Sequence, residues 1–293
     1  MAIDRTPLVF SCRDDYFLPT LCMLDSLKRY NQEFDLYYAY YKDSISPSFI
    51  ERLKEKAPIS IHEVAIDYYP DPSVFKPYPS EVFLKLAICY SQIPLNWFLW
   101  CDSDIIFRDD VAPFCEQAKC KGDDLCFYGV EERFPNQTKK NESIGVTDGL
   151  YLNAGFIMIN ACAVRKVFPT LVSLAQAIKN RTPPFPIPDQ DAINVLFNGM
   201  KSAQKNDRYM RFSQKKWLGD PQYVAARPSV IHFAGPNKPW APYGRCSFRS
   251  CFWKYGKKRY SLANKITLFF RRIIWFLLRF IYKYLVRSDK FSS

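Results

Sequence analysis

Short apolar runs alternate with helix-patterned segments through the first half of the chain. The runs PLVFSC (7–12) and FDLYYAYY (34–41) are typical of buried strands, and residues 18–30 between them place leucines on one helical face. Neighbouring parallel strands need helical crossovers of this kind. The alternation therefore predicts an α/β fold with a mainly parallel central sheet and helices on both faces.

The same pattern continues along the chain. Further strands are expected at 59–66, 125–130, 151–160 and 229–235, and further helices at 47–56, 80–91 and 163–179. Residues 131–149 are polar and are expected to form a long loop. Four prolines precede Asp189, where another helix is expected to begin.

Positive charge is concentrated at the C-terminal end. The chain has 41 basic and 29 acidic residues, a net charge of +12, and residues 251–293 contain 11 of the basic residues and one acid. We therefore expect one α/β domain in residues 1–250 and a separate basic tail in residues 251–293. The longest uncharged stretch of the tail, 273–278, has six residues, which is too short to span a bilayer.

The tail combines basic and aromatic residues at helical spacing. Such a helix is typical of an anionic membrane surface, and the alternative is a C-terminal helix packed on the domain. Nucleic acid is not an expected partner, because no recognition module accompanies the charge.

The ten cysteines do not have the spacing of a disulfide framework or a zinc site. No CxxC pair occurs, and His62 and His232 are the two histidines of the sequence. The thiols are expected to be reduced, and the N-terminal segment lacks an apolar run of signal-peptide length. These features predict a cytoplasmic protein.

Asp102 and Asp104 lie one residue apart in FLWCDSDIIF (98–107), whose apolar residues predict a buried strand with the acidic pair at its end. In an extended segment alternate side chains point the same way, so the two carboxylates repel each other unless a cation lies between them. Mg²⁺ and Mn²⁺ prefer such oxygen ligands and often share the phosphates of a substrate. The alternative is a solvated turn after a strand.

A second cluster of polar residues lies in HFAGPNKPW (232–240). It combines the His232 imidazole, Gly235, which allows close backbone approach, and Lys238, a point cation suited to phosphate. An imidazole ligand would favour Mn²⁺ over Mg²⁺. The alternative is that His232 is a core histidine with a satisfied hydrogen bond.

Two further motifs have both a structural and a functional interpretation. In DQDAIN (189–194) the acids suit a helix N-terminus, while Asp189 and Gln190 could also hydrogen-bond a polyol. Asn153, Ala154 and Gly155 form a small-residue step that indicates either a bulge or room for a ligand.

With CDSD, LNAGFIMIN, DQDAIN and HFAGPNKPW in this order, the chain resembles glycosyltransferase family 8 from about Leu8 to Trp240. It is similar in particular to bacterial galactosyl- and glucosyltransferases that build lipopolysaccharide and lipooligosaccharide. The resemblance implies a GT-A fold, UDP-galactose or UDP-glucose as the donor, a saccharide or glycolipid acceptor, and retained configuration at the anomeric carbon. With the basic tail, it implies an enzyme bound peripherally to the cytoplasmic face of the inner membrane.

The resemblance also implies a role for each matched residue. Asp102, Asp104 and His232 would hold Mn²⁺, with Mg²⁺ as the second candidate. Asp189 and Gln190 are the implied catalytic residues. The implied donor-binding residues are Ser11, Asp14, Asp15, Tyr16, Lys85, Asn153, Ala154, Gly155, Gly235 and Lys238. Acceptor contacts are expected from residues 131–149 and from the surroundings of Trp217 and Trp240.

Gln190 is a poor nucleophile, so same-face attack is favoured over a covalent intermediate on Asp189. Two positions depart from the family pattern: Arg13 stands where an acid is frequent, and Phe83 stands where an arginine is common. Lys85, two residues on, is the nearby cation. Two other functions stay open: another divalent-metal phosphoryl or nucleotidyl transferase, and a catalytically weak membrane-surface binding module.

Overall fold

The computed structural model describes residues 5–31, 34–64, 80–91, 93, 95–132, 137–181, 185–204, 210–212, 228–235, 238–241 and 248–259, with 265–267, 269–270, 273–274 and 277 in the tail. The chain divides into two compact units, Met1–Arg211 with Arg227–His232, and Phe212–Ala226 with Phe233–Ser293. The domain boundary expected at residue 250 stays a prediction.

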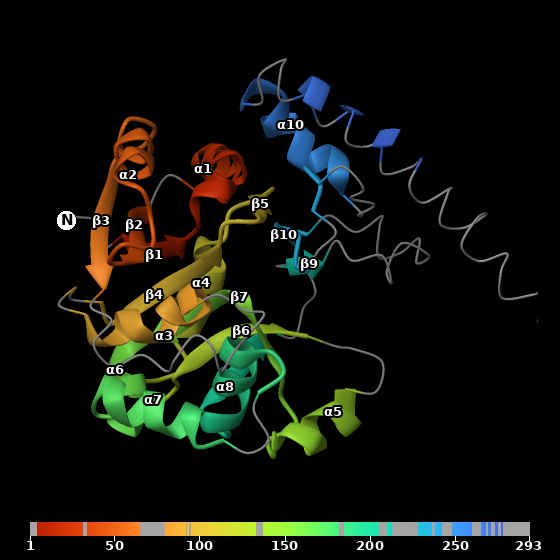
Figure 1. The fold of residues 1–293 in the computed structure, drawn as a ribbon. Helices are drawn as coiled ribbons and strands as arrows, with labels where there is room; N and C mark the ends of the chain where they lie inside the picture. Colours follow the sequence, from red (N-terminus) through yellow and green to blue (C-terminus); the bar gives the residue numbers. More distant parts are fainter. Residues whose placement is uncertain are drawn as a thin grey trace, which may run out of the picture. The chain divides into compact units, whose positions relative to one another are not determined.

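A seven-stranded sheet in the order β3-β2-β1-β4-β7-β6-β8 forms the centre of the first unit (Figure 1). The strands are β1 (Thr6–Ser11), β2 (Phe34–Tyr41), β3 (Ile59–Val64), β4 (Trp97–Asp102), β6 (Phe127–Glu131), β7 (Leu152–Asn160) and β8 (Lys201–Gln204). Every pairing is parallel except those of β7, which runs antiparallel to β4 and β6. The prediction of a mainly parallel sheet is confirmed.

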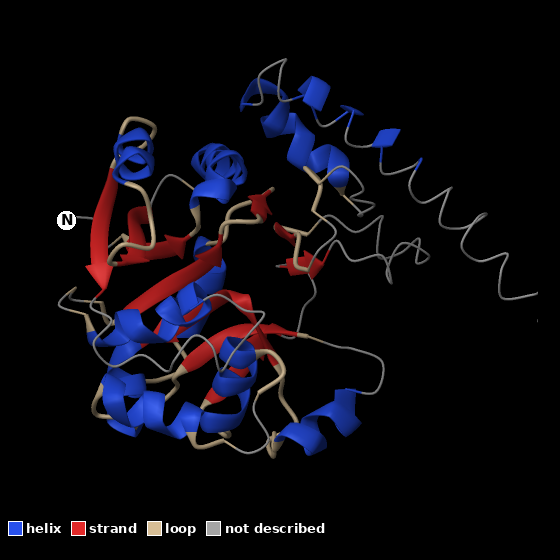
Figure 2. Ribbon diagram, in the orientation of Figure 1, coloured by secondary structure: helices blue, strands red, loops and turns tan. Residues whose placement is uncertain are grey.

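Helices cover both faces of this sheet (Figure 2). Helices α1 and α2 lie on one side, and α3, α6, α7 and α8 lie on the other. The bounds are α1 (Phe17–Tyr30), α2 (Pro47–Lys54), α3 (Leu84–Ala87), α4 (Ala112–Lys119), α5 (Gln137–Ile144), α6 (Ala161–Val167), α7 (Leu171–Lys179) and α8 (Pro188–Leu196), with 3-10 turns η1 (Asp14–Tyr16), η3 (Ser80–Phe83) and η4 (Ile88–Tyr90).

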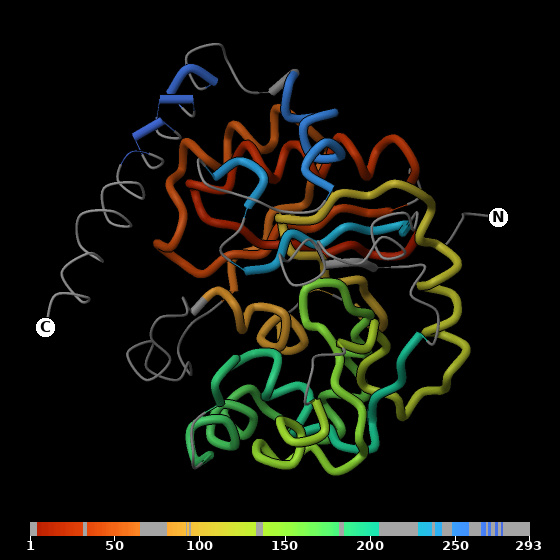
Figure 3. Tube along the Cα trace, turned by 90° about the vertical axis from the view of Figure 1, so that its right-hand side faces the viewer, coloured from red at the N-terminus to blue at the C-terminus, as the bar shows by residue number. Residues whose placement is uncertain are grey.

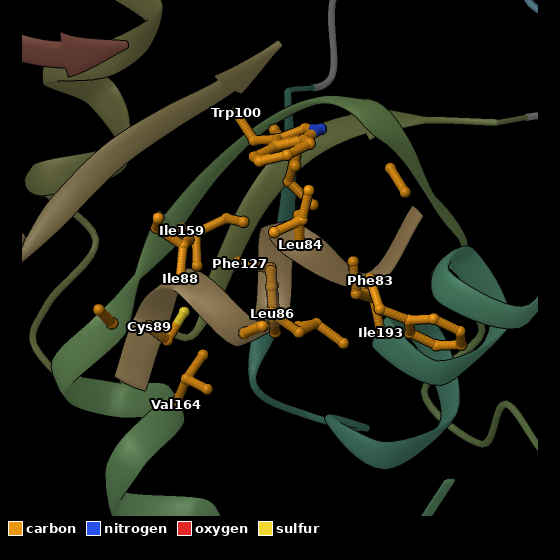
Figure 4. Close-up of a cluster of buried hydrophobic side chains, with 14 of the residues drawn as sticks. Phe83, Leu84, Leu86, Ile88, Cys89, Trp100, Phe127, Ile159, Val164 and Ile193 are labelled. Atoms are coloured by element: carbon orange, nitrogen blue, oxygen red, sulfur yellow. The ribbon is translucent and has the colours of Figure 1, made fainter. Parts of the chain in front are cut away.

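The main apolar cluster fills the space between the sheet and the second helix layer (Figure 4). Phe98 and Trp100 of β4 face this cluster, while Cys101, which follows Trp100, contacts Met23 of α1 on the opposite face. Because both faces of β4 are covered, its residues must be apolar until the strand ends at Asp102.

Several buried cysteines belong to these apolar layers. Cys12, Cys89, Cys101, Cys115 and Cys126 are buried free thiols. Burial raises the pKa of Cys12 and of Cys126 to about 12. They therefore pack as small neutral hydrophobes.

One helix prediction and one loop prediction were wrong in detail. The single helix expected at 163–179 is divided into α6 and α7, because Pro169 cannot continue a helix and Thr170 begins a new one with a capping box to Ser173. The loop expected at 131–149 contains α5, whose polar sequence QTKKNESI shows little of the periodicity that marks an amphipathic helix.

A three-stranded sheet, in the order β5-β10-β9, consists of β5 (Ile105–Phe107), β10 (Val230–His232) and β9 (Met210–Phe212). Strands β5 and β10 run side by side and antiparallel, with His232 opposite Ile105 (Figure 3). Short strands so far apart in sequence are not marked by local periodicity, and β5 was not separated from β4 in the prediction.

The second unit contains α10 (Arg249–Arg259), whose buried Phe252 contacts the rings of Phe233, Trp240 and Trp253. Among the described residues between 265 and 277, six apolar side chains are exposed: Ile266, Phe269, Phe270, Ile273, Ile274 and Leu277. None of the described helices alone has the length and apolarity to cross a membrane, and only the bent pair α6 and α7 meets that requirement jointly.

Candidate active site

Two strand ends bring three potential metal ligands together. Strand β4 ends at Asp102, a turn through Asp104 leads into β5, and β10 pairs with β5 so that His232 comes opposite Ile105. The His232 Nε2 atom lies 3.2 Å from Asp104 Oδ1 and 3.7 Å from Asp102 Oδ2. One ligand atom from each residue lies within 4.8 Å of the others. The structure thus brings together the three predicted metal ligands.

This donor set fits a hard to borderline divalent cation. Ligands about 2.1 Å from an octahedral ion lie about 3 Å apart when adjacent, close to the separations found here. Two carboxylate oxygens suit Mg²⁺ or Mn²⁺, and the imidazole nitrogen shifts the preference toward Mn²⁺. Asp104 and His232 are also buried, so a cation would compensate charge that water does not reach.

Gly155 makes room for two of these ligands. A Cβ atom at this position would lie 2.3 Å from His232 Cε1 and 2.6 Å from Asp102 Oδ2. The sequence had indicated a bulge or room for a ligand. The structure shows that the space is taken by the protein's own side chains.

The bulge interpretation also holds for this segment. The pairing of β6 with β7 shifts from Gly129–Ile157 to Glu131–Leu152, so β7 has extra residues at this point. Two backbone N–H groups of the bulge are satisfied by side chains: Ala154 N donates to Gln190 Oε1 over 3.0 Å, and Gly155 N donates to Asn153 Oδ1 over 2.9 Å. Gln190 and Asn153 therefore hold the strand that carries Gly155.

Glu132 lies against the same amides and was missed in the sequence. Its Oε2 atom accepts hydrogen bonds from Asn153 Nδ2 over 3.1 Å and from Gln190 Nε2 over 2.8 Å, and the residue is 4% exposed. The available signal was its position just after strand β6. The same argument singled out Asp102 at the end of β4.

Phe83 stands where the family commonly has an arginine, and Lys85 supplies a cation in its place. Phe83 lies in the apolar cluster (Figure 4), whereas Lys85 donates a hydrogen bond to Asp189 Oδ2 and lies 3.8 Å from Asp102 Oδ1. Burial lowers the pKa of Lys85, but attraction to Asp189 and Asp102 outweighs burial and raises it. The ammonium group therefore stays charged between two carboxylates.

Trp100 fixes the carboxylate of Asp102. Its indole Nε1 donates to Asp102 Oδ1 over 2.9 Å, and both residues lie on one face of β4 because they are two apart. The Oδ2 atom is the oxygen nearer His232. The two oxygens of Asp102 thus have different partners, and Trp100 is a second residue that the sequence analysis did not assign to the site.

The DQD segment serves two purposes. Asp189 and Gln190 face the polar residues just described, while Asp191 Oδ2 accepts from Ile187 N over 2.7 Å and caps α8. Burial raises the pKa of Asp191, which also accepts a hydrogen bond from Tyr151. The structural interpretation is therefore right for Asp191, whereas Asp189 and Gln190 face the site.

Some of the residues at and after the end of β1 lie at the same end of the sheet as Asp102. Ser11 pairs with Asp102 across β1 and β4, and no partner for its buried Oγ is present among the described residues. Asp14, Asp15 and Tyr16 form the 3-10 turn η1. Arg13 forms an exposed ion pair with Asp15 over 3.6 Å. Their contacts with a nucleotide stay a prediction.

Gly235 and Lys238 belong to the second unit. Gly235 has a φ of 78°, which favours glycine, and Lys238 Nζ donates to the carbonyl oxygen of Phe233 over 2.8 Å. Their binding of a diphosphate stays a prediction, and Trp217 lies outside the described residues.

Comparison with known proteins is consistent with this arrangement. The model of Glycosyl transferase family 8 matches residues 7–243. Glycosyltransferase GlyF of Streptococcus pneumoniae serotype 4 is 21% identical over 274 residues, covering 86% of this chain and 61% of GlyF. General stress protein A of Bacillus subtilis is 22% identical over 281 residues, covering 87% of this chain and 94% of that protein.

The fold is also found in solved structures. An active-site mutant of LgtC superposes with a TM-score of 0.66 at 18% identity, covering 88% of this chain and 97% of LgtC. The galactosyltransferase LgtC in complex with donor and acceptor sugar analogues gives a TM-score of 0.63. The expected GT-A fold is confirmed by these structures. Because the family model spans most of the sequence, the chain belongs to glycosyl transferase family 8.

Proposed function

We propose that this glycosyltransferase moves galactose or glucose from a UDP-sugar to a saccharide acceptor, with Mn²⁺ and with retained configuration. The observation that carries the proposal is the grouping of Asp102, Asp104 and His232 within 4.8 Å at the end of β4. LgtC, of the same fold, was solved with donor and acceptor sugar analogues. A lipopolysaccharide or lipooligosaccharide core is the proposed acceptor.

Separate groups of residues are proposed to bind the diphosphate and the sugar of the donor. Asp102, Asp104 and His232 would hold the cation, which neutralises charge that develops on the leaving diphosphate. Gly235 and Lys238 are proposed to bind the same diphosphate. Asn153, Asp189 and Gln190 are proposed to orient the sugar, with Asp189 held by Lys85.

Same-face attack is the mechanism that best fits these contacts. Gln190 Oε1 already accepts hydrogen bonds from Asn153 Nδ2 and Ala154 N, so it has no free lone pair for a covalent bond. Asp189 Oδ2 is occupied by the Lys85 ammonium group. The bond from the anomeric carbon to the diphosphate oxygen breaks as the bond to the acceptor oxygen forms. The acceptor proton passes to the leaving phosphate oxygen.

UDP release from a panel of nucleotide sugars with Mn²⁺ tests this proposal. We expect slow release from UDP-galactose or UDP-glucose without acceptor, and its loss in Asp102→Ala and Asp104→Ala variants of unchanged melting temperature. Release of UMP or of a sugar 1-phosphate in place of UDP would favour a phosphoryl or nucleotidyl transferase. If no sugar is turned over and UDP with Mn²⁺ does not stabilise the protein, the binding module is favoured.

We also propose that the tail holds the enzyme on the cytoplasmic face of the inner membrane. The supporting observation is that six apolar side chains between Ile266 and Leu277 are 40% to 60% exposed. They lie in a segment with 11 basic residues and one acid. Exposed apolar groups beside cations are the features that favour an anionic membrane surface.

A further inference from the structure

The sugar-facing end of α8 is joined to the bulge of β7 by a closed set of hydrogen bonds. Gln190 Oε1 accepts from Ala154 N over 3.0 Å and from Asn153 Nδ2 over 3.1 Å, and Gln190 Nε2 donates to Glu132 over 2.8 Å. Asn153 Nδ2 also donates to Glu132, and its Oδ1 accepts from Gly155 N. These contacts join β6, β7 and α8 in one network.

Each amide in this network has a single satisfactory orientation. A flipped Gln190 would turn its NH₂ group toward Ala154 N, and a flipped Asn153 would turn its NH₂ group toward Gly155 N. Both flips would place two donors face to face. The correct orientation points both NH₂ groups at Glu132, which supplies the acceptor that they need.

Glu132 is suited to this task by burial and by its acceptor-only chemistry. It is 4% exposed, and Asn153 and Gln190 are 4% and 6% exposed, so water cannot readily replace the carboxylate. An ionised carboxylate forms stronger hydrogen bonds than a neutral acceptor does. Its Oε2 atom receives both amide groups.

We propose that Glu132 is a positioning residue of the transfer reaction. Its carboxylate fixes the amides of Asn153 and Gln190, which keeps the Gln190 carbonyl oxygen on the bulge. The inference rests on the proposed function, because it assumes that Gln190 and Asn153 orient the donor sugar. Glu132 itself makes no bond to the reacting atoms.

The test compares Glu132→Gln with Glu132→Met in the full-length protein. The probe is UDP release, with Mn²⁺, from whichever of UDP-galactose and UDP-glucose the wild type consumes. The Gln variant keeps an acceptor oxygen for both amides and should retain kcat within about fivefold. The Met variant leaves both amides without that acceptor, and its kcat should fall about 100-fold while KM for the donor changes less than about threefold.

A double variant shows whether Glu132 acts through Gln190. In a Gln190→Met background, adding Glu132→Met should lower kcat by less than about threefold further, because the group that it positions is absent. Calorimetric affinity for UDP with Mn²⁺ should be unchanged in Glu132→Met. If Glu132→Met fails to bind UDP, Glu132→Asp is used in its place. The shorter side chain withdraws the carboxylate from the two amides, and kcat should fall about tenfold.

Equal loss of kcat in the Gln and Met variants would overturn the proposal, because it would give the carboxylate a chemical role of its own. Additive losses in the double variant would overturn it as well. Absence of UDP release by the wild type would instead contradict the proposed function, so the two failures are distinguishable.

Discussion

Gly155 lies so close to His232 that a side chain of any kind would collide with the imidazole. A Cβ atom on Gly155 would stand 2.3 Å from His232 Cε1. The same Cβ atom would stand 2.6 Å from Asp102 Oδ2, so neither His232 nor Asp102 could keep its position.

Gly155→Ala should lower Mn²⁺ affinity at least tenfold, because both His232 and Asp102 must move to admit the methyl group. Electron paramagnetic resonance of free Mn²⁺ during a titration measures this affinity. Gly149→Ala is a matched control for the cost of a methyl group, because a Cβ there has no neighbour within 4 Å, although its φ of 73° adds strain. Equal Mn²⁺ affinity in wild type and Gly155→Ala would contradict the prediction.

Trp100→Phe should weaken Mn²⁺ binding by about tenfold, because Asp102 loses the indole donor that fixes its carboxylate. The same titration measures the effect. Phe98→Leu is the control, because it removes volume from the same apolar cluster without removing a hydrogen bond to Asp102. A similar change of affinity in the two variants would attribute the effect to packing.

Lys85→Met should lower the free energy of unfolding by about 3 kcal/mol, because it leaves Asp189 without its buried partner. It should also slow UDP release at least tenfold. Lys201→Met is the control. Lys201 is also buried, and its Nζ atom lies 2.8 Å from Asp148 Oδ2, in an ion pair that does not involve the metal ligands. Urea unfolding and UDP release separate stability from activity. Slow release in both variants would indicate a general effect of lost stability.

Asp148 should make the protein sensitive to acid. Burial raises its pKa, but hydrogen bonds from Lys201 and from the N–H groups of Gly199 and Leu150 outweigh burial and lower it. The folded state thus binds this proton less tightly than the unfolded state does. Asp148 therefore contributes stability above its unfolded pKa of about 3.9, and this contribution is lost as the pH falls through its folded pKa.

Asp148→Asn should accordingly be less stable than wild type at pH 6, and the difference should shrink between pH 4 and pH 2. Urea unfolding across this range measures both free energies. A difference that stays constant with pH would show that the carboxylate does not titrate with folding.

Removal of residues 260–293 should abolish flotation with vesicles that contain an anionic lipid. Phe269→Asn with Phe270→Asn should reduce it at least tenfold, because these side chains are 60% and 57% exposed. Val172→Asn, at an apolar position that is 44% exposed outside the tail, should have no effect. Flotation by the deleted protein equal to that of wild type would contradict the membrane proposal.

Local patterns in the sequence predicted the alternation of strands and helices and the types of ligand at the candidate metal site. Both depend on local signals: apolar periodicity marks β1, β2 and β4, and polar residues at a strand end mark Asp102 and Asp104. The break between α6 and α7 was also within reach, because Pro169 is visible in the sequence.

Tertiary structure alone decided the contacts between residues far apart in the chain. The three-residue strand β5 brings His232 to Asp104, and Glu132 meets Gln190 across 58 positions. The packing of β7 places Gly155 against His232 and Asp102. The packing of η3 and α3 buries Phe83 in the apolar cluster and brings Lys85 to the carboxylates. No periodicity within a single segment encodes such contacts, because they arise only when separate strands and helices are packed together.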